Sequence, residues 1–434
     1  MSRLTSTVLL ILVLAGLVGY IYFADQPSED TAKPERAFTG VSADDVDEVS
    51  ITTGGQHTTV RRTGDAWKVV EPLEADADGG ELSSIVASLG TLDVQRVVDE
   101  KPSDLKQYGL DPARIEVAFK TKADKTPKRV LFGEKAPAGG DLYAKLPDSP
   151  RVFLVSSYLD STFNRDTFAL RDKTILKFER AKVDGFTVTD GSTRLRFKKS
   201  GQEWSIVEPI AARADFAAVE GALERLGSAR MQGVTADAAP DLGPYGLDKP
   251  TTTFAVTAGS ATATLTLGRT ENALVFARDG SRSMVFTVAP TLRTDVVKPV
   301  DDFRRKDLFD FRSFTATRVE VTRGTDTLVL EKTKGADGKD AWKNGAGKTL
   351  DATKVDDALT KLSSLRAQSF EAGTHASLKT PAVVVTAAFD KRTETASIGR
   401  AGADAFAVRT GEPGQARVDT AALDDALKAL DALK

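Results

Sequence analysis

The sequence predicts an α+β protein: an N-terminal transmembrane helix followed by tandem repeats of antiparallel β-meanders with packed amphipathic helices. Two observations predict this class. An uncharged apolar run occupies Leu4–Ala24, and the rest of the chain repeats itself at a nearly constant spacing. Within each copy, short β-branched runs of alternating polarity precede a stretch with helical periodicity, a pattern typical of strands followed by a helix.

The apolar run has the length of a membrane-spanning helix. It contains 21 residues, and about 20 are needed to cross a bilayer. Arg3 precedes it and Asp25 follows it, so the positive-inside rule keeps the N-terminus cytoplasmic and places the remainder outside. A cleaved signal peptide is the alternative, but the run is long for one, and Tyr22 stands where cleavage requires a small residue. We therefore expect an uncleaved anchor at 1–24, followed by a polar tether at 25–45.

The composition excludes several classes of protein. The 434 residues are 41% hydrophobic and 28% charged, which is ordinary for folded domains. The 59 basic and 62 acidic residues are interleaved and give a net charge of −3, so no basic stripe favours a nucleic-acid partner. Cysteine is absent, which excludes disulfides, thiolate metal sites and cysteine nucleophiles.

The repeat is visible as a constant spacing between aromatic residues. Trp67 and Trp204 are 137 residues apart, as are Tyr108 and Tyr245, and Trp342 marks a third, eroded copy. A period this long indicates whole domains rather than solenoid units. We expect three such domains, at 46–178, 179–313 and, in degenerate form, 314–434.

Each copy has the same order of predicted elements. In the first copy, three alternating runs between Val46 and Pro72 are predicted strands. A helix follows, with apolar residues at helical spacing: Leu82, Ile85, Val86, Leu89 and Leu92. Equivalent helices are predicted at Phe216–Ala229 and Asp351–Leu365. Strands then resume and a short helix is predicted at Ser156–Phe163, so each copy is expected to contain two similar halves.

A Tyr-Gly-Leu-Asp stretch recurs in the first two copies, and we interpret it as a helix stop. Ser103 is the expected N-cap, and Gly109 is expected in the left-handed conformation just past the helix end. Leu110 supplies a contact back onto the last turn, and Tyr108 is expected to be an aromatic anchor. The second copy repeats these roles with Tyr245, Gly246 and Leu247. The third copy lacks the tyrosine and the glycine, which argues against a duplicated catalytic site.

The search for catalytic chemistry finds no constellation. The two histidines, His57 and His375, occupy unmatched positions and are expected to be exposed. Glu71 and Glu208 recur before a proline, but each is expected to stand alone at a strand end. We therefore assign no catalytic, cofactor-binding or metal-binding residue.

Two other sets of residues mark the repeats. The charged cluster Arg304–Asp307 parallels Arg171–Lys173, and either a solvated connection or a contact surface would explain it. The positions that define the repeat motif are aromatic, proline, glycine and leucine residues: Trp67, Pro72, Tyr108, Gly109, Leu110, Trp204, Pro209, Tyr245, Gly246, Leu247 and Trp342.

These motifs together resemble one bacterial family. The chain has an N-terminal span, W-x-[IV]-x-x-P motifs, Tyr-Gly-Leu-Asp motifs and strand ends of the form Leu131-Phe132-Gly133 and Leu265–Gly268. It resembles domain-of-unknown-function family 4340, well over Val46–Asp310 and weakly beyond. The resemblance implies an envelope protein associated with ABC-type export systems similar to the gliding-motility transporter, hence an accessory role beside a permease or other envelope protein. It implies no catalytic residues.

Three functions remain open. The leading hypothesis is a membrane-anchored extracytoplasmic binding or scaffolding protein without a cofactor. The alternative is a carboxylate-dependent hydrolase acting on cell-envelope polymers, which requires two carboxyl groups converging in one pocket. The third is peptide capture along a long, uncovered sheet edge.

Overall fold

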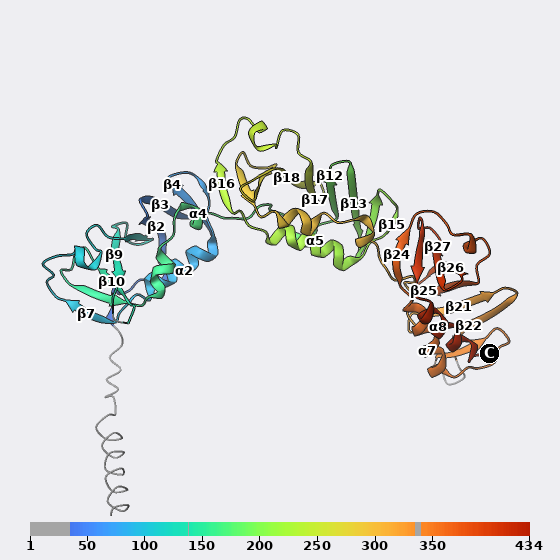
Figure 1. The fold of residues 1–434 in the computed structure, drawn as a ribbon. Coiled ribbons are helices and arrows are strands. Elements are labelled where there is room, and N and C mark those ends of the chain that lie inside the picture. Colours follow the sequence, from blue (N-terminus) through green and yellow to red (C-terminus); the bar gives the residue numbers. More distant parts are fainter. Residues whose placement is uncertain (1–34, 138, 335–339) are drawn as a thin grey trace, which may run out of the picture. The chain divides into compact units, whose positions relative to one another are not determined.

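The computed structural model describes residues 35–137, 139–334 and 340–434. The expected membrane anchor at Leu4–Ala24 lies outside these ranges, and no helix within them is both long and apolar enough to span a bilayer. The chain divides into two compact units, Met1–Asp172 and Lys173–Lys434. Figure 1 labels the elements of both units.

The described part of the first unit is built on one nine-stranded antiparallel sheet of order β5-β4-β3-β2-β8-β9-β10-β11-β7. Its strands are β2 Val46–Thr53, β3 Gln56–Thr63, β4 Ala66–Glu71, β5 Ala75–Asp76, β7 Arg96–Asp99, β8 Ile115–Thr121, β9 Lys128–Lys135, β10 Leu142–Lys145 and β11 Val152–Val155. Its helices are α2 Gly79–Gly90, α3 Tyr158–Phe163 and α4 Thr167–Leu170. Val49 of β2 lies opposite Phe119 of β8. The two halves, β2–β5 with α2 and β8–β11 with α3, therefore join into one continuous sheet.

The described residues of the second unit form two further antiparallel sheets, one of nine strands and one of eight. The second sheet contains β12 Gly185–Asp190, β13 Thr193–Ser200, β14 Glu203–Glu208, β15 Ala212–Arg213, β16 Gly233–Ala236, β17 Thr252–Ala258, β18 Ala261–Glu271, β19 Leu274–Asp279 and β20 Val285–Val288, with helices α5 Phe216–Ser228 and α6 Thr291–Val296. The third contains β21 Ala316–Arg323, β22 Asp326–Lys334, β23 Asp340–Asn344, β24 Ala367–Glu371, β25 Val383–Phe389, β26 Arg392–Ala401, β27 Asp404–Arg409 and β28 Gln415–Val418, with helices α7 Ala352–Ser363 and α8 Thr420–Asp431. Both follow the strand order of the first sheet, and in the third the counterpart of β5 and β15 is a single bridge between Lys343 and Thr349. The predicted antiparallel sheets with packed helices are confirmed.

The core follows the periodicity that predicted these elements. Strand β8 buries alternate residues, and α2 buries four of its predicted apolar positions, Leu82, Ile85, Val86 and Leu89. In Figure 1, α5 runs along one side of the sheet that contains β12 and β17. Among the described residues, five helices begin after an aspartate whose carboxylate accepts a backbone N–H of the first turn: Asp78, Asp166, Asp215, Asp351 and Asp419.

Residues 35–45 differ from the expected tether. Strand β1 (Glu35–Arg36) pairs with β6 (Asp93–Val94). The ring of Phe38 packs edge-on against Phe119 with 4.9 Å between centroids, and Val41 is buried as well. Phe38 and Val41 belong to the first hydrophobic core, so their burial and the β1–β6 pairing together fix this segment on the first unit. The prediction of a tether at 25–45 was therefore wrong for residues 35–45.

Candidate functional site

The Tyr-Gly-Leu-Asp stretch forms a tight turn in both copies. A single 3₁₀ turn ends at Tyr108, and Gly109 follows with φ 67°; the second copy has Gly246 at φ 66°. Both glycines adopt the predicted left-handed conformation. The prediction that Ser103 caps a helix was wrong, because the turn is too short to begin there. Asp104 instead accepts the Lys106 N–H at 2.9 Å.

The turn lies on another glycine of the repeat. A Cβ atom on Gly133 would overlap the carbonyl oxygen of Tyr108, and one on Gly268 would overlap that of Tyr245. The Tyr-Gly-Leu motif and the strand that carries this glycine therefore form one packing unit. The prediction that these strands end at the glycine was wrong, since β9 continues to Lys135 and β18 to Glu271. Leu110 and Leu247, the leucines of the two motifs, are buried beside it at 3% and 5% exposure.

The other motif residues also support the fold. Trp67, Trp204 and Trp342 are 5%, 2% and 8% exposed and belong to the cores of their sheets. Tyr108 is half-buried, donates to Asp99 at 3.3 Å and packs edge-on against Tyr143, and Tyr245 packs in the same way on Phe276. Pro72 and Pro209 follow the last residues of β4 and β14 and are exposed. The structure does not bring these residues together into a site.

The carboxylates and histidines considered for catalysis are held by structural partners. Glu71 accepts the Thr59 hydroxyl at 2.9 Å, and Glu208 pairs with two arginines, at 3.2 and 2.8 Å. His57 is exposed on β3, as predicted. His375, predicted to be exposed, is half-buried because its ring stacks on Phe406 at 4.3 Å. No group of three or more potential metal ligands occurs in the described parts of the chain.

One recess does bring two carboxylates together. It has a volume of about 210 Å³ and is lined by Glu48 of β2 and Glu116 of β8, among others. Burial raises the pKa of Glu48, but hydrogen bonds from Lys120 and Arg61 outweigh it, and the pKa lies below its usual value. Glu48 is therefore held as a carboxylate, whereas a general acid for glycoside hydrolysis needs a raised pKa.

The strongest candidate site is a polar joint in the second unit, formed where the segment 304–311 passes from the second sheet to the third. The backbone N–H of Arg305 donates to Arg213 of β15 at 3.0 Å. On the other side, Ala367 donates to Lys306 at 2.7 Å and Leu308 donates to Leu365 at 2.9 Å. The segment thus extends the edge of one sheet and the edge of the next. Peptide capture is excluded at these two edges, because both are covered.

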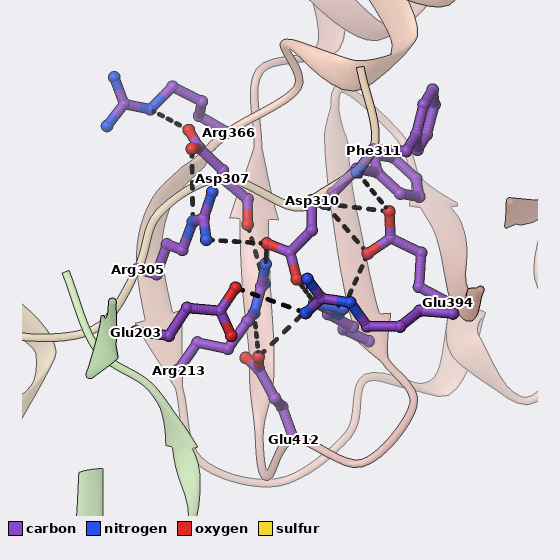
Figure 2. A network of polar contacts seen from close by, with 12 residues as sticks. Glu203, Arg213, Arg305, Asp307, Asp310, Phe311, Arg366, Glu394 and Glu412 are labelled. Atoms are coloured by element: carbon purple, nitrogen blue, oxygen red, sulfur yellow. Dashed lines mark hydrogen bonds and ion pairs between the residues drawn. The ribbon is translucent and has the colours of Figure 1, made fainter. Parts of the chain in front are cut away.

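Charged side chains surround this segment, with Asp310 at their centre (Figure 2). Asp310 pairs with Arg213 at 2.6 Å and with both Arg305 and Arg409 at 3.0 Å. Arg213 also binds Glu412, so one guanidinium of the second sheet holds two carboxylates of the joint. Asp307 extends the network to Arg366 at 3.3 Å.

Glu394 is the most buried charged residue of the joint, at 5% exposure. Its carboxylate accepts the backbone N–H groups of Asp310 and Phe311 at 3.0 and 2.8 Å and pairs with Arg409 at 2.7 Å. Figure 2 shows it on the opposite side of Asp310 from Arg305. A buried charge with three partners of this kind is satisfied, and removal of one partner is costly.

The charges of the joint reinforce one another. Burial raises the pKa of Asp310, but Arg213, Arg409 and Arg305 outweigh it and lower that pKa below its usual value. Burial lowers the pKa of Arg213, whereas Glu412 and Asp310 raise it more, so the guanidinium stays charged. Both partners therefore remain ionised at neutral pH.

Arg304 contributes by stacking. Its guanidinium lies 3.7 Å from the ring centroid of Phe370 and donates to the Pro413 carbonyl at 3.1 Å. Burial lowers the pKa of Arg304 despite the opposing charges of Asp301 and Glu412. The charged cluster Arg304–Asp307 is thus a contact surface within this unit, the second of the two interpretations that the sequence left open.

Sequence reasoning missed the other charged residues of the joint. Arg213, Glu394, Arg409 and Glu412 are scattered in the chain and match no motif. One signal was present: Glu394 alternates with Ala396 and Ile398, which places a carboxylate on the core-facing side of β26. A charge at a core-facing position requires a buried partner.

The fold and the polar joint define the class of protein. It consists of tandem α+β domains, and polar side chains join the domains of the second and third sheets. The chain belongs to the family described as Domain of unknown function (DUF4340), whose sequence profile matches residues 67–206 and 204–383. The matched segments contain the Trp and Tyr-Gly-Leu-Asp motifs, so the family resemblance is confirmed. No curated protein matches the chain.

Among solved structures, similar chains are bacterial DNA polymerase sliding clamps. One from Pseudomonas aeruginosa shares 10% identity, over 87% of this chain and 91% of that chain, with a TM-score of 0.16. A DNA polymerase III subunit beta from the same organism gives 12% identity, 87% and 92% coverage and a TM-score of 0.17. A sliding clamp from Caulobacter crescentus shares 10% identity, over 88% of this chain and 92% of that chain, with a TM-score of 0.15. TM-scores this low carry no argument about fold or function.

Proposed function

We propose that this protein is a membrane-anchored extracytoplasmic scaffolding and binding protein, an accessory component of an ABC-type export or gliding-motility-like system. The observation that carries the proposal is the polar joint. Its charged residues satisfy one another and hold two domains as one body, which is the property that a scaffold needs. No substrate is required to explain their presence.

The acid–base properties of the chain support a binding role over hydrolysis. Eight carboxyl groups of the described residues have a lowered pKa: Glu48, Asp124, Asp160, Asp190, Glu220, Asp310, Asp340 and Asp431. A glycoside hydrolase keeps one carboxyl group protonated near neutral pH to protonate the leaving group. The scaffold is therefore the better-supported reading.

The anchored topology is testable because the chain contains no cysteine. Single substitutions Ser2→Cys and Ser364→Cys place one thiol on either side of the proposed anchor, and Ser364 is exposed. In intact cells, or in spheroplasts where an outer membrane is present, a membrane-impermeant maleimide should label the second variant only. Lysis should make the first reactive too. Labelling of neither variant before lysis would contradict the proposed topology.

The proposed partner is testable by co-purification. Mild detergent extraction should recover a permease or an ATPase with the protein. Arg213→Ala, which loosens the joint, should lower that recovery, whereas Arg318→Ala removes an exposed ion pair and should leave it unchanged. Recovery of the intact protein alone, from membranes that contain the transporter, would argue strongly against the accessory role.

A further inference from the structure

The edges of the first and second sheets make equivalent backbone contacts. Asp172 donates its N–H to the Asp76 carbonyl of β5 at 2.8 Å, as Arg305 donates to that of Arg213 in β15 at 3.0 Å. The pairing of β5 with β4 has the register of the pairing of β15 with β14. Asp76 is therefore the equivalent of Arg213, and Asp172 is the equivalent of Arg305. An edge that carries two arginines in the second sheet carries two aspartates in the first.

The third domain contributes to the joint a face formed by Asp310, Arg409 and Glu412, and Figure 2 shows Asp310 and Glu412 on Arg213. The second domain has an equivalent face. In the pairing of β19 with β18, Asp279 occupies the register position that Arg409 occupies in the pairing of β27 with β26. Three residues later, Arg282 donates its N–H to the carbonyl of Asp279, as Glu412 donates to that of Arg409.

The segment that enters each domain supplies the remaining position. In both segments a lysine carbonyl accepts a backbone N–H of the domain that follows, Lys173 in the second and Lys306 in the third. Lys177 and Asp310 follow these lysines four residues later. At all five positions of the joint the equivalent residue has the opposite sign: Asp76 for Arg213, Asp172 for Arg305, Lys177 for Asp310, Asp279 for Arg409 and Arg282 for Glu412.

The exchange of sign does not extend to the rest of the segment. Arg304 pairs with Asp301 rather than with these five residues, and its equivalent, Arg171, has the same charge. Lys306 likewise has a lysine, Lys173, at the equivalent position. The difference between the two places is therefore a coordinated exchange among the charges of the joint and not a general change of composition.

The sign of each charge matters because the charges are close and largely shielded from water. Asp310 lies 2.6 Å from Arg213 and 3.0 Å from Arg305. The side chains of Arg213 and Glu412 are 20% and 14% exposed. Carboxylates in place of the two arginines would face Asp310 and Glu412 and repel them, because such a site screens charge weakly. The pattern therefore permits reversal of every sign together, but not reversal on one side alone.

We propose that the signs of these five charges determine which sheet edge a domain of this chain accepts. The face of the third domain fits a basic edge such as β15 and excludes an edge with the acidic charges of β5. A face with every sign exchanged, as in the second domain, fits an acidic edge. The charges thus select the partner of the face as well as hold it. The inference rests on the polar joint and not on the proposed accessory role.

The test uses spin labels on the full chain, which contains no cysteine. Gln202→Cys and Ser364→Cys place one label on the second domain and one on the third, and both positions are exposed. Double electron–electron resonance then measures the distribution of distances between the two labels. A docked joint should give one narrow distance, whereas an open joint should give a broad distribution.

Two sets of substitutions exchange the signs. The edge set, Arg213→Asp with Arg305→Asp, gives β15 the charges of β5. The face set gives the third domain the charges of the second, and it includes Glu394→Ala because Ala263 occupies the register position of Glu394. Either set alone should abolish the narrow distance, and the two sets together should restore it. The face set consists of Asp310→Lys, Glu394→Ala, Arg409→Asp and Glu412→Arg.

A neutral edge separates repulsion from the mere loss of ion pairs. Arg213→Asn with Arg305→Asn removes the same charges without adding carboxylates, so its ratio of open to docked molecules should be at least about tenfold below that of the edge set. Equal broadening by the two variants overturns the proposal, and so does a narrow distance in the edge set. This comparison does not require the combined variant to fold. A combined variant with wild-type hydrogen-exchange protection in β17 and β25 but a broad distribution overturns the proposal too.

Discussion

The carbonyl oxygen of Tyr245 lies directly over Gly268, in space that a Cβ atom at that position would occupy. The contact joins the helix-stop turn to the interior of β18, and the first sheet repeats it with Tyr108 and Gly133 of β9. Backbone atoms on both sides leave nothing flexible to move aside. The contact explains two motifs of the repeat, the Tyr-Gly-Leu turn and the strand glycine, by a single packing requirement.

Gly268→Ala should therefore destabilise the second unit by about 2 kcal/mol, the usual cost of overpacking. The measurement is the free energy of unfolding from denaturant titration. Gly221→Ala is the matched control, because nothing lies within 4 Å of a Cβ atom there and Gly221 is inside α5. That control should stabilise the protein by about 0.5–1 kcal/mol. Equal effects of the two substitutions would contradict the packing argument.

Arg213→Ala should loosen the joint. It removes the closest cation of both Asp310 and Glu412, in a site where the Arg213 side chain is only 20% exposed, and leaves them Arg409 at 3.0 and 3.9 Å. We expect a loss of about 2 kcal/mol, below the cost for a fully buried pair. Hydrogen exchange should accelerate in 306–311 and in β24, with α5 unchanged. The control Arg318→Ala, whose side chain is 44% exposed, should cost clearly less than Arg213→Ala, because water screens an exposed ion pair. Similar losses of unfolding free energy in the two variants would mean that the ion pairs of the joint contribute no more than an exposed pair.

Acid should weaken the same joint in a defined direction. The pKa of Asp310 is lowered in the folded state, from about 3.9 in an unfolded chain. The charged Asp310 carboxylate therefore stabilises the folded state fully above the pKa of the unfolded chain. This stabilisation is lost as the pH falls through the lower pKa of the folded state. The difference in unfolding free energy between wild type and Asp310→Asn should be constant from about pH 7 to 5 and shrink below about pH 4. A difference that shrinks already between pH 7 and 5 would show that another group controls the joint.

The aspartate caps should contribute independently of the joint. Asp215 accepts the Ala218 N–H at 2.9 Å at the start of α5. Asp215→Ala should cost about 1 kcal/mol, whereas Asp215→Ser should cost less because its hydroxyl is also a good cap. Denaturant midpoints of the two variants measure the difference. Equal losses would indicate that the charge of Asp215, rather than its capping bond, matters.

Much of the fold could be predicted because short-range patterns determine it. The spacing of Leu82, Ile85, Val86 and Leu89 reports one buried helix face, and Gly109 reports a left-handed turn. Such patterns depend on neighbours within one or two turns of the same element. The end of the tether was predicted wrongly because it depends on a distant contact: Phe38 packs on Phe119, far along the chain.

The joint could not be predicted because ion pairs obey no spacing rule. Arg213 and Glu412 are 199 residues apart, and Arg409 and Asp310 are 99 apart. The cluster Arg304–Asp307 was visible in the sequence, but charge alone did not distinguish a solvated connection from a bonded one. The partners became evident only when the sheets placed them side by side.

The segment that forms the joint has a mechanical consequence. Its backbone is bonded at Arg305 to one sheet and at Lys306 and Leu308 to the next, and the N–H groups of Asp310 and Phe311 are held by Glu394. Such a segment has almost no slack, so tension along the chain is borne by hydrogen bonds and ion pairs rather than by uncoiling of a loop. The connection between these two domains therefore acts as a stiff coupling that passes force from one to the other.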